Sequence, residues 1–346
     1  MSAWASSVSV SARRKEWHLP DFGASLCSTL DDRERLGLPK HFVPARFSGE
    51  LPALYDRVRS WTKQRLLEGL ISCESSLALR LACGQQLALV GDPRLRPEHP
   101  EMLAVSGGCV SVGLEPSQID KVMSDYAGLG LNRSWIEKET PRHEVSLAPF
   151  RLARFPVTNE EFRAFLLDTG YPEIPSSWAF RQFPQNQSNH PVYTVSADAA
   201  DAYARWLSAR TGRGFRLPSE AEWEWAAAGP QGREFPWGEE FDADLANTAE
   251  TGLFRSSPVG AFVGGEGPFG HVDLAGNVEE YVADNYAAYP GGTFVADHLV
   301  RIHGTYRVAR GGSFARFRDL ARNCRRHGHN PRSATYAMGF RLAETL

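Results

Sequence analysis

The chain has 346 residues, of which 42% are hydrophobic and 23% are charged, so it can bury a large core and has the composition of a globular protein. Its formal net charge of −3 argues against general binding to nucleic acid, which a strong basic excess would indicate. The sequence contains no run of about 18 apolar residues, so it predicts no membrane-spanning helix.

The first residues, MSAWASSVSVSARRKEWH, contain serine and arginine but no continuous apolar stretch of the kind found in signal peptides. Widely spaced cysteines without a CxxC pair are found at Cys27, Cys73, Cys83, Cys109 and Cys324. Such isolated thiols are typical of a reducing compartment rather than of a disulfide scaffold or a zinc site. These features predict a cytoplasmic protein, with a transit-like leader as the alternative.

Residues 1–100 read as an N-terminal helical segment followed by a connector. Apolar residues recur at helical spacing between Leu51 and Val90, and the sequence Gly-Asp-Pro that comes next is typical of a helix end. The proline-broken stretch PRLRPEHPEM predicts a connector. We expect two or three helices that brace the domain formed by residues 101–346. Regulation and dimerisation are the alternatives, and the oligomeric state stays open.

From Met102 onward the sequence changes to short strands and glycine-rich turns. The stretch MLAVSGGCVSVGL predicts a hairpin that turns at Gly107 and Gly108, and HEVSLAPFRLARFPVT predicts further strands. Clusters of Gly, Pro, Asn and Asp recur every few positions after Gly229, which predicts long irregular loops around a small sheet.

Three helices are expected between these strand-rich regions. Thr158 and Glu161 have the spacing of a capping box, in which the two side chains bond to each other's backbone N–H groups. A second helix follows Ser196. The third begins at Ser219, which forms another capping box with Glu222.

Seven segments in this part of the chain carry a resemblance: ETPRHEVSLAPFRLARFPVTNEEFRAFL, HPVYTVSADAADAYARWLS, GFRLPSEAEWEWAAAG, FPWGEEF, DLAGNVEEYVAD, RVARGGSF and MGFRLA. In this order they resemble the sulfatase-modifying-factor superfamily, whose namesake is the formylglycine-generating enzyme. The resemblance implies an α+β, C-type-lectin-like fold with long irregular loops over residues 101–346. It also implies that RVARGGSF and MGFRLA are neighbouring strands, so that the polar stretch between them is presented as a surface.

The resemblance does not extend to the copper site of the formylglycine-generating enzyme. That enzyme binds copper through two cysteines shortly after the GGS strand, and here those positions fall on Arg316 and near Ala321. Cys324 is close by but has no second cysteine near it. Because cuprous copper in such a site needs two soft thiolate ligands, the sequence predicts neither copper binding nor formylglycine generation by this chemistry.

A calcium site is suggested by the segment GNVEEY. The family's corresponding GNVWEW segment often contributes to a calcium site, and this chain keeps Asn277 and Glu280 while Glu279 replaces the first tryptophan. Asp273 and Asp284 add hard oxygen donors of the type that calcium prefers. The alternative is that these residues only cap a loop.

The arginine-rich stretch 313–339 holds the candidate ligand-binding residues, namely Arg316, Phe317, Arg318, Arg325, His327, His329 and Tyr336. Guanidinium forks suit carboxylate or phosphate, and arginine with tyrosine is enriched at binding hot spots. This predicts recognition of a polar or anionic small molecule, peptide or protein, with neither nucleic acid nor membrane as partner. The pattern also resembles the variable region of diversity-generating-retroelement targets, a point that one sequence leaves open.

The alternative function is that of a metal-dependent oxidoreductase, with non-haem iron, that modifies an amino-acid or peptide substrate. His327 and His329 are two residues apart, so on an extended segment both point to one side. A third ligand would come from one of the histidines in the preceding loops, at His271, His298 or His303. Related sulfoxide synthases hold iron through an HxxxHxE-type helix in a separate N-terminal domain, and this spacing is absent from residues 1–100.

Overall fold

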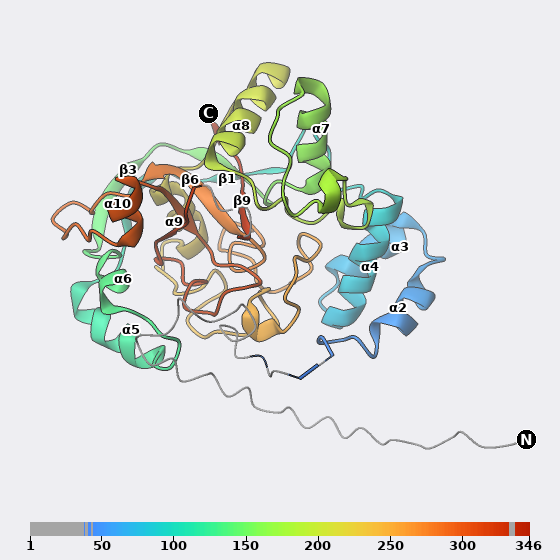
Figure 1. Ribbon diagram of the computed structural model, residues 1–346, viewed down its shortest axis with the longest axis horizontal. Coiled ribbons are helices and arrows are strands. Elements are labelled where there is room, and N and C mark those ends of the chain that lie inside the picture. The colour runs from blue at the N-terminus through green and yellow to red at the C-terminus, as the bar shows by residue number, and fades with distance from the viewer. Residues whose placement is uncertain (1–37, 39–40, 43, 332–335) are drawn as a thin grey trace, which may run out of the picture.

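The structure is a computed structural model, and it describes residues 38, 41–42, 44–331 and 336–346. The first residues of the sequence, for which a transit-like leader is the alternative prediction, and Cys27 lie outside these residues. Figure 1 shows a central body of strands and loops with α7 and α8 above it, α2–α4 on one flank, and α5, α6 and α10 on the other. None of the helices in the described ranges combines the length and apolarity needed to cross a bilayer.

The expected N-terminal helices are confirmed as α2 (Leu51–Val58), α3 (Lys63–Ile71) and α4 (Leu77–Val90). The hydroxyls of Thr62 and Ser76 cap α3 and α4 by accepting backbone N–H groups of the first turn. Leucines of these helices form one hydrophobic cluster with Phe262 of the main body. A Cβ added to Gly84 would lie 2.6 Å from Pro258, so α4 packs closely against the main body. The domain boundary near residue 100 stays a prediction.

Two four-stranded sheets and a two-stranded ribbon form the core of the main body. The first sheet has the order β1 (Met102–Val105), β4 (Phe150–Ala153), β10 (Ala343–Thr345), β5 (Gly214–Arg216), and its strands are antiparallel. The ribbon pairs β2 (Gly108–Val112) with β3 (His143–Leu147). The second sheet has the order β8 (His327–Gly328), β7 (Arg307–Arg310), β6 (Glu279–Asn285), β9 (Met338–Phe340), with β6 and β9 parallel.

Two predicted strand pairings are wrong. β1 does not form a hairpin with β2: Met102 pairs with Ala153 of β4, and Gly108 pairs with Leu147 of β3. The strands on either side of the arginine-rich stretch are also not adjacent, because β6 lies between β7 and β9. The stretch is nevertheless anchored at both ends, since both strands belong to the second sheet.

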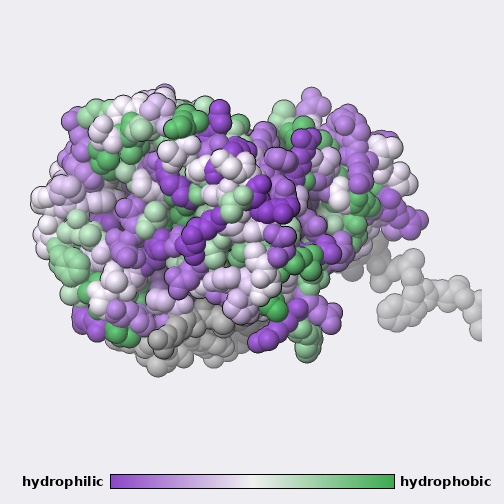
Figure 2. All heavy atoms as spheres, turned by 90° about the horizontal axis from the view of Figure 1, so that it is seen from above, coloured by the Kyte–Doolittle hydropathy of each residue, from purple (hydrophilic) through white to green (hydrophobic). Residues whose placement is uncertain are grey.

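The three predicted helices are confirmed as α7 (Asn159–Thr169), α8 (Ala197–Thr211) and α9 (Glu220–Ala228). Both predicted capping boxes form, at Thr158 with Glu161 and at Ser219 with Glu222. α7 and α8 pack their aromatic and aliphatic side chains on the second sheet in the largest hydrophobic cluster. On the face seen from above these helices, apolar side chains lie in small groups separated by polar ones (Figure 2).

Several short helices are not predicted by the sequence pattern. They are α5 (Ile119–Asp125), α6 (Arg133–Glu137), α10 (His298–His303), and the 3₁₀ turns η1 (Pro116–Gln118), η2 (Ala179–Arg181), η3 (Gln185–Gln187) and η4 (Ala249–Thr251). Each is too short to show a clear period of 3.6 residues in the sequence. One of them, α5, contributes Lys121, Val122 and Asp125 to the wall of a pocket in the main body.

Candidate functional site

The second sheet brings together side chains that are far apart in the sequence. Its register pairs Tyr281 of β6 with Ala309 of β7, and Ala309 with His327 of β8. Because paired residues point to the same face of a sheet, these three side chains share a face, and Glu279, two residues before Tyr281, points the same way. Ala309 is fully buried and has only a methyl side chain, so it leaves space above β7 for its neighbours.

Five residues meet above this face, and we call them the Glu279 cluster: Glu279, Arg316, His327, His329 and Tyr336. Nδ1 of His327 lies 2.6 Å from one carboxylate oxygen of Glu279, and the Tyr336 hydroxyl donates to the other at 2.6 Å. Arg316 Nε lies 3.8 Å from the same carboxylate and also donates to the Tyr336 hydroxyl. The imidazole of His329 stacks on the Tyr336 ring, with 4.1 Å between ring centroids.

The charges in the Glu279 cluster follow from burial and from these contacts. Burial alone would raise the pKa of Glu279, but His327 and then Arg316 outweigh it and hold that pKa below its usual value. Burial lowers the pKa of His327, although Glu279 partly opposes this effect. Burial also lowers the pKa of His329 to about 4. At neutral pH the cluster therefore holds an ionised carboxylate and two neutral imidazoles.

The hydrogen bond to Glu279 assigns the tautomer of His327. An ionised carboxylate only accepts hydrogen bonds, so Nδ1 of His327 carries the proton and Nε2 carries a lone pair. Nε2 of His329 is buried and has no hydrogen-bond partner among the described residues. The two histidines thus present two imidazole nitrogens that can bind a proton, a polar ligand or a metal ion.

These donors resemble, but do not complete, a non-haem iron site. Two imidazoles and a carboxylate are the typical ligand types of such a site. Over residues 38, 41–42, 44–331 and 336–346, however, no three His, Cys, Asp or Glu side chains are placed to hold one ion. His271, a predicted third ligand, is instead buried against the Leu152 carbonyl, with 3.2 Å between Nε2 and the oxygen, and burial lowers its pKa to about 3.

The remaining predicted ligand-binding residues differ in their placement. Phe317 is half-buried and packs on the apolar cluster around Phe235. Arg318 is half-buried, and its guanidinium lies 5.8 Å from the centroid of the Tyr126 ring. Both residues follow Arg316 in the sequence. Their contacts, however, are with the apolar cluster around Phe235 and with Tyr126, and not with the Glu279 cluster.

Arg325 is placed differently from what the sequence predicts. Its side chain is 2% exposed and lies 3.6 Å from Glu139 and 3.9 Å from Asp319. A guanidinium buried among carboxylates holds the fold together and does not reach a ligand at the surface. Contact between Arg325 and a ligand stays a prediction, and at this burial it would need a ligand that enters the interior.

The predicted calcium ligands also have structural partners. Both carboxylate oxygens of Glu280 accept hydrogen bonds of 2.7 Å from Arg341, and one also accepts 2.7 Å from the Trp223 indole. The Asn277 amide bonds to the backbone of Ser257, at 3.0 Å through its oxygen and 3.2 Å through its nitrogen. These bonds occupy the oxygens that calcium would need, so in this structure Asn277 and Glu280 connect a loop and a strand, and the calcium site stays a prediction.

Glu279 is the functional candidate that sequence reasoning missed. It is fully buried at the start of β6, next to Glu280, and the two carboxylates point to opposite faces of the strand. The strand alternation predicts opposite faces, but it does not show that one carboxylate meets Arg341 and the other His327. The substitution of a family tryptophan by Glu279 was the available signal.

Comparisons with known proteins place this site in context. A profile of the family described as "Sulfatase-modifying factor enzyme 1-like domain" matches residues 89–346. Hercynine oxygenase from Mycolicibacterium thermoresistibile is 33% identical over 77% of this chain and 64% of that protein. The formylglycine-generating enzyme of Thermomonospora curvata is 31% identical over 72% of this chain and 96% of that enzyme.

Other relatives match different shares of their own length. The serine/threonine-protein kinase Pkn1 of Chlamydia trachomatis is 30% identical over 94% of this chain and 50% of that protein. The chain thus spans 64%, 56% and 50% of three of the curated relatives it matches. Activities of those whole proteins do not transfer with the shared domain alone.

Solved structures agree on the fold. PvdO from Pseudomonas aeruginosa matches with a TM-score of 0.56 and 28% identity, over 72% of this chain and 95% of that one. The variable protein 1 of Treponema denticola matches with a TM-score of 0.52 and 22% identity, over 70% of this chain and 94% of that one. These matches confirm the α+β fold that the seven sequence segments imply.

Proposed function

The chain belongs to the sulfatase-modifying factor enzyme 1-like family, and from this membership we propose that it is an oxidoreductase that modifies a polar substrate of amino-acid or peptide type at the Glu279 cluster. The hercynine oxygenases of two Mycolicibacterium species, 33% and 31% identical to this chain, support this class of activity. Formylglycine generation through a copper dithiolate is not proposed, because Arg316 and Ala321 stand where the two cysteines would be.

The observation that carries the proposal is the buried Glu279 carboxylate with its three polar neighbours. A buried charge costs several kcal/mol unless other groups compensate for it, and here His327, Tyr336 and Arg316 all converge on it. Arg316 occupies the position at which the family resemblance puts the first copper-binding cysteine. The chain keeps the fold of the family but has a charged group where the family has a metal ligand. We therefore infer that the chemistry at this position has changed and has not been lost.

The cluster supplies residues with distinct roles. Glu279 holds His327 with Nδ1 protonated, so Nε2 is available to take a proton from a substrate as a general base. The Arg316 guanidinium lies 4.3 Å from the Tyr336 ring centroid, and its positive charge would orient a substrate carboxylate. The imidazole of His329 stacks on the Tyr336 ring and restricts the motion of that ring.

Iron is the metal that the family resemblance favours for this activity, and it would supply the activation of oxygen when bound. Within the described ranges, the donors are two imidazole nitrogens and a carboxylate that already bonds to His327 and Tyr336. This set is an incomplete fit to a three-ligand iron site. The roles given to Glu279 and Arg316 therefore do not depend on the metal, whereas the lone pair on His327 Nε2 serves either as a metal ligand or, without metal, as a general base.

A second candidate function is recognition of a polar or anionic small molecule, peptide or protein without chemistry. The stacking of His329 on Tyr336, with Arg316 over the same ring, favours it. Such a combination of arginine and aromatic side chains is typical of binding hot spots. The two candidates share the same residues and differ in whether oxygen is consumed.

One experiment separates the two candidates. The full chain is purified without chelator, its metal content is measured by mass spectrometry, and oxygen uptake is recorded with ferrous iron and a panel of amino acids that includes hercynine. For an oxidoreductase we expect about one iron per chain and oxygen uptake that depends on one member of the panel. The double variant His327→Ala/His329→Ala should lose both signals.

The matched control is His99→Ala, which changes an exposed histidine in the connector. It should retain the metal and the oxygen uptake of the unmodified chain. Calcium alone, unchanged in the double variant and without oxygen uptake, would contradict the oxidoreductase and leave ligand recognition. Iron retained by the double variant would place the metal elsewhere and contradict the role of the two histidines.

A further inference from the structure

A pocket lies apart from the Glu279 cluster, between α5, β2, the end of α9 and residues 232–239. Its cavity is about 170 Å³, and residues 322–324 of the arginine-rich stretch form its floor. None of the five cluster residues lines it. Since one water occupies about 30 Å³ in the liquid, the cavity has room for a ligand of only a few non-hydrogen atoms.

The pocket contains a buried acceptor that lacks a donor. Asn323 is 1% exposed, and its side-chain nitrogen donates to the Arg233 carbonyl at 2.9 Å. Its backbone N–H donates to the Glu234 carbonyl at 2.7 Å, which fixes the residue in place. The side-chain oxygen, however, has no hydrogen-bond partner within the described part of the chain. Buried acceptors are rarely left in this state, so this atom points to a ligand that donates a hydrogen bond.

Most charges along the wall of the pocket are already paired. Arg322 bonds to Glu139 at 2.9 Å and to Glu234 at 3.1 Å. Glu224 accepts from the Gly113 backbone and from Arg310. These pairs fix the side chains of the wall, and the paired groups add little net charge to the pocket.

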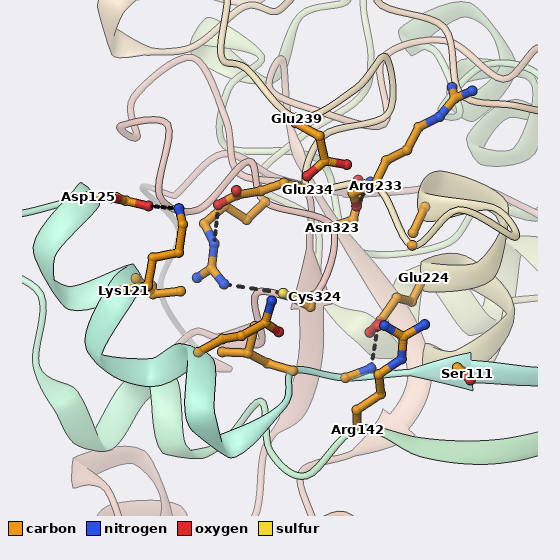
Figure 3. Close-up of a pocket in the computed structure, with 17 residues that line it drawn as sticks. Ser111, Lys121, Asp125, Arg142, Glu224, Arg233, Glu234, Glu239, Asn323 and Cys324 are labelled. Carbon is orange, nitrogen blue, oxygen red and sulfur yellow. Dashed lines mark hydrogen bonds and ion pairs between the residues drawn. The ribbon is translucent and has the colours of Figure 1, made fainter.

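Two charged side chains at the pocket have neither an ion pair nor a side-chain hydrogen bond with any described residue: Arg142 and Glu239. Arg233 also lacks an ion pair, but its guanidinium donates to the Gln231 side chain at 3.0 Å and to the Pro236 carbonyl at 3.1 Å. The Arg142 guanidinium lies against the turn at Gly232, where an added Cβ would approach it to 3.3 Å. Figure 3 shows Glu234, Glu239 and Asn323 toward one end of the pocket, Arg142 toward the other, and Cys324 between them. Among the side chains left without a partner, the pocket thus has a cation, Arg142, toward one end, and an acid, Glu239, with the open acceptor of Asn323 toward the other.

From this arrangement we propose that the pocket binds a small zwitterionic amino acid. The ammonium group donates to the side-chain oxygen of Asn323 and faces Glu239, while the carboxylate accepts from Arg142. A ligand with a single charge would leave one end of the pocket unmatched, and a nucleotide or peptide would exceed the cavity. This site is independent of the proposed oxidoreductase activity.

Cys324 at the centre of the pocket serves in packing and does not act as a nucleophile. Its sulfur accepts a hydrogen bond of 3.2 Å from Arg322 and lies 3.6 Å from Glu139. Burial raises the pKa of the thiol to about 12, so the thiolate needed for covalent chemistry does not form at neutral pH. The site is therefore a reversible binding site.

The test uses the full chain and isothermal titration calorimetry with glycine, L-alanine and L-serine, which fit the cavity. Acetate and methylammonium, each carrying one of the two charges, are titrated under the same conditions. We expect saturable binding of at least one amino acid, and at least tenfold weaker binding of both single-charge probes. Arg142→Gln and Glu239→Gln should each weaken amino-acid binding at least tenfold, and both positions are exposed, so the fold should persist.

The matched controls are Glu240→Gln, next to Glu239 but outside the pocket lining, and Arg59→Gln on α2. Both should bind as the unmodified chain does. Three results would overturn the proposal: no saturable binding of the three amino acids at millimolar concentration, binding that Arg142→Gln and Glu239→Gln leave unchanged, or acetate binding as tightly as the amino acid. Oxygen uptake enters none of these readouts, so the result is separate from the proposed activity.

Discussion

Nδ1 of His327 lies 2.6 Å from a carboxylate oxygen of Glu279, although the two residues belong to β8 and β6 and β7 separates these strands. The bond crosses β7 above Ala309, where the side chain is a single methyl group. A carboxylate that is fully buried therefore keeps its charge by contact with the arginine-rich stretch. The position and the ionisation of these two residues depend on each other.

The first prediction concerns this dependence. Glu279→Gln removes the negative charge that favours the protonated form of His327, so the pKa of His327 should fall below its value in the unmodified chain. Histidine ¹⁵N or ¹³C chemical shifts recorded against pH measure this pKa directly. Glu240→Gln, which changes an exposed carboxylate elsewhere, should leave the titration of His327 unchanged. A pKa that stays the same or rises in Glu279→Gln would show that the contact is not made in solution.

The second prediction concerns the ion pair between Glu280 and Arg341, whose side chains are 1% and 0% exposed. Among the described residues, Arg341→Met leaves the buried Glu280 carboxylate with one side-chain donor, the neutral Trp223 indole N–H. Breaking a buried pair on one side costs about 3–5 kcal/mol, and the free energy of unfolding should fall by that amount. Urea unfolding at pH 7, followed by circular dichroism, measures the change.

The control for this measurement is Arg59→Met. The Arg59 and Asp56 side chains are 74% and 78% exposed, with 3.6 Å between charged atoms. An exposed pair of this kind contributes about 0–1 kcal/mol, so the control should unfold nearly as the unmodified chain does. Equal losses in the two variants would mean that Arg341 is not buried against Glu280. Added calcium should not restore Arg341→Met to the stability of the unmodified chain.

The third prediction concerns the pH dependence of stability. Burial raises the pKa of Glu161 to about 7 from its ordinary value of 4.5. Between these two values the folded chain binds the proton more tightly than the unfolded chain, so this residue makes stability fall as pH rises from about 4.5 through 7. Glu161→Gln removes this term, and unfolding at a series of pH values should show a smaller loss of stability between pH 5 and 8, by on the order of 2 kcal/mol.

The comparison between the two chains isolates Glu161. His190 and His271, whose pKa values burial lowers to about 3, act in the opposite direction as the pH changes, but they are present in both chains. Glu240→Gln, which changes an exposed carboxylate that does not act on Glu161, is the matched control and should follow the unmodified chain. If Glu161→Gln lost as much stability with rising pH as the unmodified chain, Glu161 would not titrate in this range.

The sequence predicts the local parts of the fold and misses the long-range ones. The capping boxes at Thr158 and Ser219 were predictable because each depends on residues only three positions apart. The pairing of Met102 with Ala153 was not, because the predicted hairpin satisfied the same local pattern at shorter range. Strand order depends on which distant faces pack together, and one sequence does not contain that information explicitly.

The same distinction applies to the Glu279 cluster. Arg316, His327, His329 and Tyr336 were predicted as candidates because they lie together in one arginine-rich stretch. Glu279 was missed because its place in the cluster depends on the register of β6, β7 and β8. Arg325 has the same residue type as Arg316 and is close to it in sequence, but a carboxylate far away in the chain, Glu139, determines its burial.

The last prediction concerns Gly328, which comes after His327 in β8. An added Cβ there would lie 2.1 Å from the ring of Tyr306, which stacks on Tyr286 and donates to Asp297 at 3.0 Å. Because this ring is held on two sides, Gly328→Ala should displace β8, cost about 1–3 kcal/mol of unfolding free energy, and lengthen the bond between His327 and Glu279. Urea unfolding and the pKa of His327 measure the two effects. Gly49→Ala, where an added Cβ meets no atom within 4 Å, is the control and should change neither. Gly328→Ala with unchanged stability would show that the Tyr306 ring moves aside freely.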